Sequence, residues 1–155
     1  MTTTFKLGKN GKLYIGSEGD DLSALTEMGG IKDPSVPMEA AEADNTFRDN
    51  GGWDSTVAGN RKLGIEFIAR WKTSDANFQA LKNAYLTGGL VRLAALTGEK
   101  SPDGITPVPG SDGPMGDFSI TNFSRSEPQN EIITCQVTAK LTTFDCWVEE
   151  GMVPA

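Results

Sequence analysis

The chain has 155 residues, two cysteines, no histidine and a formal net charge of −7. This length fits one domain that buries about 68–70% of its unfolded surface, so neither a disulfide nor a metal ion is needed to hold it together. The lack of histidine excludes His-based catalytic triads and His-containing metal sites.

The first 44 residues predict two strands joined by an irregular connection. The first strand covers residues 11–16, and the second covers residues 36–44, where Pro37 indicates a sheet edge. The connection, residues 17–35, holds at most one helical turn near residues 21–26.

Acidic side chains are concentrated in residues 17–54. This segment holds ten acidic and two basic side chains, a balance of −8 that exceeds the net charge of the chain. An acidic domain repels phosphate, so tight nucleic-acid binding is disfavoured. Ordinary solubility explains the same acids equally well.

Residues 45–60 predict a polar loop with turn signals at both ends. It is much longer than the usual hairpin connection of about two to five residues. Yet it carries Phe47, Trp53 and Val57, which a fully solvated loop has no reason to hold. Either these side chains fold back onto their own domain or they meet another chain.

Residues 62–71 predict a strand with one buried face, because apolar and polar side chains alternate with period two. The inward set is Leu63, Ile65, Phe67, Ala69 and Trp71. Ile68 lies on the other side, so the opposite face is not purely a solvent face.

A helix and a strand follow. Residues 76–87 predict a helix with an N-cap cluster at residues 73–75 and a Gly88-Gly89 stop. Its packing face is expected to hold Phe78, Leu81, Tyr85 and Leu86. Residues 90–97 predict a strand that is apolar on both faces except for Arg92.

The last third predicts a long loop, a hairpin and a tail. Residues 98–117 hold five glycines and four prolines, so most of this segment is neither helix nor strand. Residues 118–126 and 131–144 predict the two arms of a β-hairpin, and residues 145–155 predict a short tail. In the second arm, Ile133, Cys135, Val137, Ala139 and Leu141 alternate with polar side chains.

No catalytic constellation is evident. Pairs such as Asp20-Asp21 or Glu149-Glu150 are neighbours on loops, whereas acid–base catalysis needs carboxylates that converge on one pocket. The acidic stretch 44–54 lacks the spacing of a calcium loop, and phosphate-binding glycine motifs are absent. Cys135 and Cys146 form no CxxC pair, so we interpret them as reduced core thiols. We therefore expect no enzyme, no cofactor and no metal.

The chain resembles the major tail tube proteins of long-tailed bacteriophages. The resemblance rests on the order of elements over residues 11–144 and on one segment, EADNT at 42–46, NGGW at 50–53 and AGNRKLGIEF at 58–67. It implies a mainly β fold with one α-helix, a β-sandwich or partial barrel of the phage tail tube type that is completed by hexameric ring assembly. Residues 1–155 would form a single tail-tube-like domain.

The resemblance also implies a function and partners. The chain would be a structural virion protein that polymerises as stacked hexameric rings into the phage tail tube, a conduit for DNA ejection. Its partners would be copies of itself, the tape measure protein, the tail terminator and the distal tail or baseplate proteins. Double-stranded DNA would pass without tight binding, and no membrane insertion is expected. The protein would assemble in the bacterial host cytoplasm and reside in the virion tail.

Site residues follow from the resemblance in two groups. The loop at residues 45–60 would make inter-subunit or inter-ring contacts through Phe47, Arg48, Asp49, Trp53 and Asp54. The lumen-facing candidates are Glu42, Glu66, Thr134, Gln136, Thr138 and Lys140. An acidic or neutral lumen lets DNA slide, and Lys62, Lys140 and Arg70 would pair across subunits with Glu66 or Glu42. The Gly/Pro-rich loop at residues 98–117 would lie outside the tube.

Three other interpretations stay open on the sequence. The first is the inner tube protein of a contractile tail or of a secretion or injection apparatus. A second is a small β-sandwich carbohydrate-binding module, which exposed and clustered aromatic side chains would favour. An enzyme is the third, and it would need converging carboxylates in a pocket.

Overall fold

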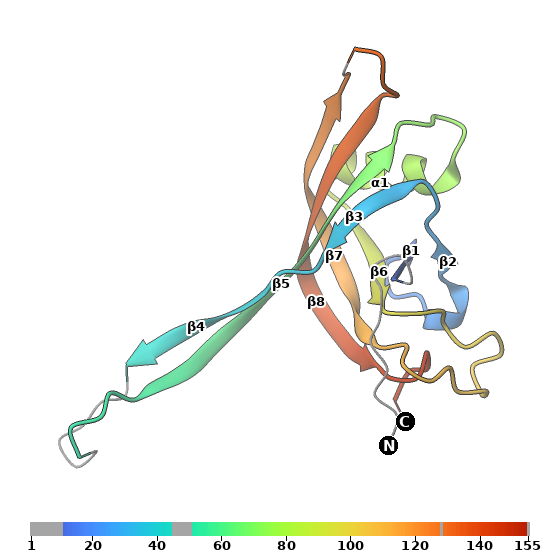
Figure 1. Cartoon of the computed structure of the whole chain (residues 1–155). Helices are drawn as coiled ribbons and strands as arrows, with labels where there is room; N and C mark the ends of the chain where they lie inside the picture. Colours follow the sequence, from blue (N-terminus) through green and yellow to red (C-terminus); the bar gives the residue numbers. More distant parts are fainter. Residues whose placement is uncertain (1–10, 45–50, 128, 155) are drawn as a thin grey trace.

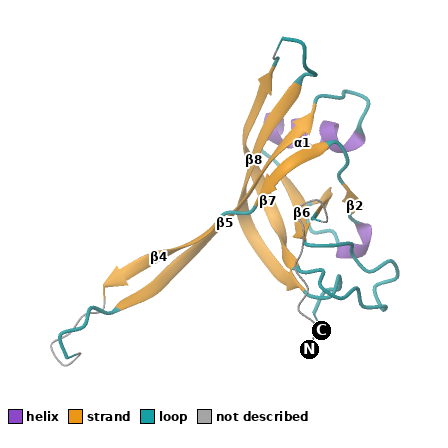
Figure 2. Ribbon diagram, in the orientation of Figure 1, coloured by secondary structure: helices purple, strands orange, loops and turns teal. Residues whose placement is uncertain are grey.

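The computed structural model describes residues 11–44, 51–127 and 129–154 (Figure 1). The strands are β1 Lys12–Ser17, β2 Thr26–Glu27, β3 Ile31–Ser35, β4 Met38–Asp44, β5 Thr56–Arg70, β6 Leu90–Leu96, β7 Gly113–Ser126 and β8 Thr134–Val148. The helix α1 spans Ala76–Thr87, and a 3-10 turn spans Leu22–Ala24. The predicted mainly β class with one α-helix is thus confirmed for the described part of the chain (Figure 2).

The strands form one sheet in the order β2-β1-β6-β7-β8-β5-β3, and β4 pairs only with β5. Every pairing is antiparallel. The sheet curves around α1 (Figure 1). Its two ends, β2 and β3, are short strands of two and five residues.

The core is divided between the two sides of β6. Val91 and Leu93 belong to a large cluster that contains Phe67, Phe118 and Leu81. The alternate residues Ala94 and Leu96 belong to a second cluster, with Tyr14, Leu22, Leu25, Met115 and Val148. Successive side chains of a strand point to opposite faces, so the predicted two-sided strand is confirmed. Full burial of a side chain such as Phe67 stabilises the fold by about 1.5–3 kcal/mol.

The helix begins and ends where the sequence predicts. Asp75 is the N-cap, and its carboxylate accepts a hydrogen bond from the Asn77 N–H at 2.9 Å. Gly88 ends the helix with a φ of 73°, a left-handed conformation that favours glycine. The prediction for Leu86 is wrong, since this side chain is 72% exposed. Leu86 comes five residues after the buried Leu81, so its side chain is rotated by about 140° around the helix axis, away from the packing face.

The two strands that flank the predicted 45–60 loop differ from their predicted bounds: β4 begins later and β5 begins earlier than expected. β4 starts at Met38, and β5 starts at Thr56 rather than at residue 62. Together they form a two-stranded arm that projects from the body of the molecule, with residues 51–55 at its tip (Figure 1). All seven residues of β4 are exposed, and so are residues 56–62 of β5. Residues 56–60 of the predicted loop are therefore the beginning of the long strand β5.

The C-terminal hairpin is also longer than predicted. β7 begins at Gly113, so the Gly/Pro-rich loop ends five residues earlier than residue 117, and β8 continues to Val148. Glycine is needed at position 113 because a Cβ there would lie 1.6 Å from the Ala95 carbonyl oxygen. Pro114 lies opposite Trp147 on β8. β3, in the segment predicted as a connection, pairs with the end of β5.

Candidate functional site: a polar sheet face and a projecting arm

One face of β5 and β8 is polar and lies opposite the core. Glu66 faces Thr138 and Ile68 faces Gln136 across the two strands, whereas Phe67 faces Val137 in the core. Directly opposed residues of an antiparallel pair lie on the same face. The structure thereby brings together five predicted lumen residues: Glu66, Thr134, Gln136, Thr138 and Lys140.

The same face continues onto β3 and β7, whose residues were not among the lumen-facing candidates. Lys32 and Ser35 of β3 lie opposite Ile68 and Glu66. Asn122, Ser124 and Ser126 of β7 lie opposite Thr138, Gln136 and Thr134. We call this surface the polar face; its members are Lys32, Ser35, Gly64, Glu66, Ile68, Arg70, Asn122, Ser124, Ser126, Thr134, Gln136, Thr138 and Lys140.

The charge of the polar face differs from the expected acidic or neutral lining. Its members include three basic side chains, Lys32, Arg70 and Lys140, and one acidic side chain, Glu66. None of the four forms an ion pair with another residue of the described ranges. The cations are separated by threonine, serine, asparagine and glutamine, so the face is weakly basic and mostly uncharged.

The sixth lumen candidate, Glu42, lies elsewhere. It belongs to β4 and pairs with Ala58 on the projecting arm. The structure therefore does not bring Glu42 together with the other five candidates. Local sequence patterns do not reveal this position, because the exposed part of β5 has the composition of a loop and does not indicate a strand that pairs with β4.

The tip of the arm holds the predicted contact residues that the structure describes. Trp53 is 77% exposed and Asp54 is also exposed. Phe47, Arg48 and Asp49 lie outside the described residues. Because the arm extends away from the body (Figure 1), Trp53 does not fold back onto its own core. Of the two interpretations of this loop, the structure excludes the folded-back one for Trp53.

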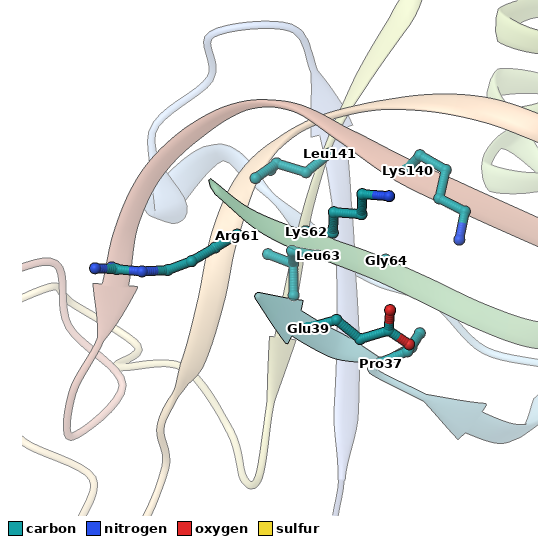
Figure 3. A pocket seen from close by; sticks show the side chains of 8 residues that line it. All are labelled: Pro37, Glu39, Arg61, Lys62, Leu63, Gly64, Lys140 and Leu141. Carbon is teal, nitrogen blue, oxygen red and sulfur yellow. The ribbon is translucent and has the colours of Figure 1, made fainter. Parts of the chain in front are cut away.

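A pocket lies where the arm joins the body. It has a volume of about 370 Å³ and is lined by Pro37, Glu39, Arg61, Lys62, Leu63, Gly64, Lys140 and Leu141. Figure 3 shows Lys62, Lys140 and Glu39 reaching toward one opening beside Gly64, whereas Arg61 points away from them. The charged residues that line this pocket are three basic side chains and one carboxylate, so it can hold an anionic or polar segment. It lacks the pair of carboxylates that acid–base catalysis would need.

Two observations concern other kinds of site. Within residues 11–44, 51–127 and 129–154, no three side chains of His, Cys, Asp or Glu gather as a metal site requires. None of the helices in these ranges is both long and apolar enough to cross a bilayer.

Comparison with known proteins gives the family. The family model for phage tail tube protein matches residues 7–143. No curated protein is significantly similar in sequence to the chain.

Solved structures share the fold. The tail of an empty gene transfer agent particle, a structure with C6 symmetry, is similar with a TM-score of 0.68 and 16% identity, over 97% of this chain and 100% of the other. The virion of a native gene transfer agent particle gives 0.66 and 16%, over 92% and 100%. The tail tube of SPP1 gives 0.65 and 14%, over 90% of this chain and 80% of the other.

These findings confirm the predicted resemblance and the predicted tail-tube fold. The family model covers most of the chain, residues 7–143 of 155. The chain therefore belongs to the phage tail tube protein family, and it is a structural protein of a tail tube.

Proposed function

We propose that this tail tube protein assembles into stacked hexameric rings, in which β3, β5, β8 and β7 of six copies close into one barrel with the polar face toward the lumen. The tube would be that of a long-tailed phage, and DNA would pass through it. The observation that carries this proposal is a continuous polar face with an open strand edge on each side.

The two open edges are specific. β3 ends the sheet and pairs with β5 alone among the described strands. On β7, residues 120–126 pair with β8 on one side, whereas the pairing with β6 stops at Ser119. Unpaired edges invite strand addition from another chain. Pairing of the β3 edge of one copy with the free edge of β7, residues 120–126, in the next copy would close the ring.

The size of such a barrel is suitable for DNA. Six copies that contribute four strands each give 24 strands; at about 4.8 Å spacing and about 40° tilt, the backbone diameter is about 48 Å. The C6 symmetry of the gene transfer agent tail supports six copies. Mostly neutral side chains on the polar face would limit the attraction for phosphate, with Lys32, Arg70 and Lys140 as the exceptions.

The partners follow from the same assembly. The lumen would enclose the tape measure protein before DNA is ejected, and the ends of the tube would meet the tail terminator and the distal tail or baseplate proteins. Assembly would take place in the bacterial host cytoplasm. The loop at residues 98–112, which holds Ile105 at 80% exposure, would lie on the outside.

Labelling of an introduced cysteine, with the buried Cys135 left in place, tests which surface lines the tube. In a Cys146→Ser background, Thr138→Cys is placed on the polar face and Ile105→Cys on the outer loop. A maleimide coupled to a large polyethylene glycol should label both variants as unassembled subunits. In tubes, only Ile105→Cys should react. Equal labelling of Thr138→Cys in intact tubes would contradict the lumen assignment.

A further inference from the structure

A second groove, lined mostly by apolar side chains, lies beside the root of the arm. It has a volume of about 570 Å³. Its apolar lining consists of Met38, Ala40, Leu63, Pro114, Leu141, Phe144 and Trp147. We call this groove the arm socket. It lies between the arm and the ends of β7 and β8, since Met38 pairs with Leu63 and Pro114 with Trp147.

The socket exposes large apolar side chains. Met38 is 56% exposed, Phe144 is 52% exposed and Trp147 is 38% exposed. The indole Nε1 of Trp147 donates to Asp112 Oδ2 at 3.2 Å, which fixes its orientation. A cluster of exposed apolar side chains with a polar rim marks an interaction surface. The rim here carries two basic side chains, Arg61 and Lys62, and one acidic side chain, Glu39, so its net charge is positive.

The tip of the arm has the complementary chemistry. Trp53 is 77% exposed and Val57 is 50% exposed, and the acidic Asp54 lies between them. Tryptophan is enriched among residues that dominate binding energy when buried in a pocket. The tip thus offers an aromatic anchor and a negative charge to an apolar groove whose rim, with two basic side chains and one acidic side chain, is positive on balance.

The tip cannot occupy the socket of its own chain. Val57 at the tip and Leu63 in the socket lie on the same strand, and β4 pairs with both residues. The six residue steps between them span about 20 Å at about 3.3 Å per residue. The β4–β5 ladder prevents the strand from folding back over that distance. The tip and the socket can therefore meet only between different copies.

We propose that the arm socket receives the arm tip, residues 51–57, of a second copy of this chain, an inference that rests on the tube assembly proposed above. A two-stranded ribbon with both faces exposed is marginally stable in water, so docking would also hold the arm straight. Every copy carries both surfaces at different places, so the contact is heterologous and propagates from copy to copy.

Disulfide cross-linking tests the contact directly. Two proteins are prepared in a Cys146→Ser background, one with Asp54→Cys at the tip and one with Ala40→Cys in the socket, and they are assembled as a mixture. Under mild oxidation, tubes should yield a cross-linked dimer that contains one copy of each. The matched control replaces Ala40→Cys by Ala80→Cys, an exposed position on α1, and should yield none.

The outcomes separate the socket from the assembly. Tubes without the Asp54–Ala40 cross-link, or with equal cross-linking in the Ala80 control, would overturn the socket and leave the tube intact; they would indicate another partner for the tip. Failure of the unsubstituted protein to form tubes at any concentration would overturn the assembly and the socket with it.

A surface substitution gives an independent readout. Phe144→Ser removes an exposed aromatic side chain from the socket, and Ile105→Ser removes an exposed apolar side chain from the outer loop. Phe144→Ser should raise the concentration needed for assembly about tenfold or more, whereas Ile105→Ser should leave it unchanged. The melting temperature of each unassembled variant shows that it is folded. Assembly of folded Phe144→Ser at the unsubstituted concentration would overturn the proposal.

Discussion

Arg92 on β6 and Asp117 on β7 lie directly opposite each other and form a bidentate ion pair inside the protein. Nε of Arg92 donates to Oδ1 of Asp117 at 3.0 Å, and Nη2 donates to Oδ2 at 3.1 Å. Nη1 donates to Asp145 of β8 at 2.8 Å. Arg92 is 8% exposed and Asp117 is 6% exposed. One guanidinium therefore connects three neighbouring strands.

Removing this guanidinium should destabilise the subunit strongly. Arg92→Leu would leave the carboxylate of Asp117 buried without its charged partner, which typically costs about 3–5 kcal/mol. Urea denaturation of the unassembled protein at pH 7 measures the loss. The control, Arg125→Leu, removes an exposed ion pair to Glu127 and a contact with the ring of Trp71, and should cost no more than about 1.5 kcal/mol. Equal losses in the two variants would contradict the account.

Stability should also fall in acid through Asp117. The hydrogen bonds from Arg92 lower the pKa of this carboxyl in the folded protein, against the opposing effect of burial. A lowered folded pKa stabilises the protein above the unfolded pKa of about 3.9, and this stabilisation is lost as the pH falls through the folded pKa. Below about pH 4, the free energy of unfolding should fall more steeply in the unsubstituted protein than in Asp117→Asn, by up to about 1.4 kcal/mol per pH unit. Parallel curves would contradict the role of Asp117.

Gly113 should not tolerate a side chain. A Cβ at this position would lie 1.6 Å from the carbonyl oxygen of Ala95, so β6 and β7 would have to move apart. Gly113→Ala should lower the free energy of unfolding by at least about 3 kcal/mol, measured by chemical denaturation. Gly29→Ala is the control, since a Cβ there meets no atom within 4 Å, and it should change stability by less than about 0.5 kcal/mol. A mild effect at Gly113 would mean that the strands can separate locally.

The two cysteines should differ in reactivity. Both are free; Cys135 is buried, and burial raises the pKa of its thiol to about 11. Only about one thiol in a thousand is then ionised at pH 8. Cys146 is partly exposed, and its pKa is raised first by burial and then by Asp145. At pH 8 a thiol-specific reagent should therefore modify Cys146 in the native protein and Cys135 only after unfolding. Rapid labelling of native Cys146→Ser would contradict this assignment.

Those parts of the fold with a strong local signal were predictable from the sequence. The helix carries its own start and stop at Asp75 and Gly88, so its bounds are correct. The alternation around Phe67 and Val137 identifies the buried face of β5 and β8, and thereby the opposite polar face. Long-range pairing was not needed to recognise either feature.

Other parts depend on tertiary pairing that local patterns do not reveal. β3 is five residues long and contains Pro34, and its pairing with β5 decides its conformation. In β7, a bulge between Ile120 and Asn122 shifts the alternation of inward and outward side chains by one residue. The sequence pattern therefore does not place Asn122 and Ser124 on the polar face. The first half of β5 is exposed on both faces, so its sequence has no apolar period that could indicate a strand. The arm socket combines β4, β5, β7 and β8, and no single segment predicts it.

A cryo-electron microscopy reconstruction of tubes assembled from the purified protein tests the central claim most directly. We expect rings of six copies in which β3 of each copy pairs with the free edge of β7, residues 120–126, in the next copy. The side chains of Glu66, Thr138 and Lys140 should then project into the lumen. A tube with the polar face on its outer surface, or a protein that stays a monomer at every concentration, would contradict the account.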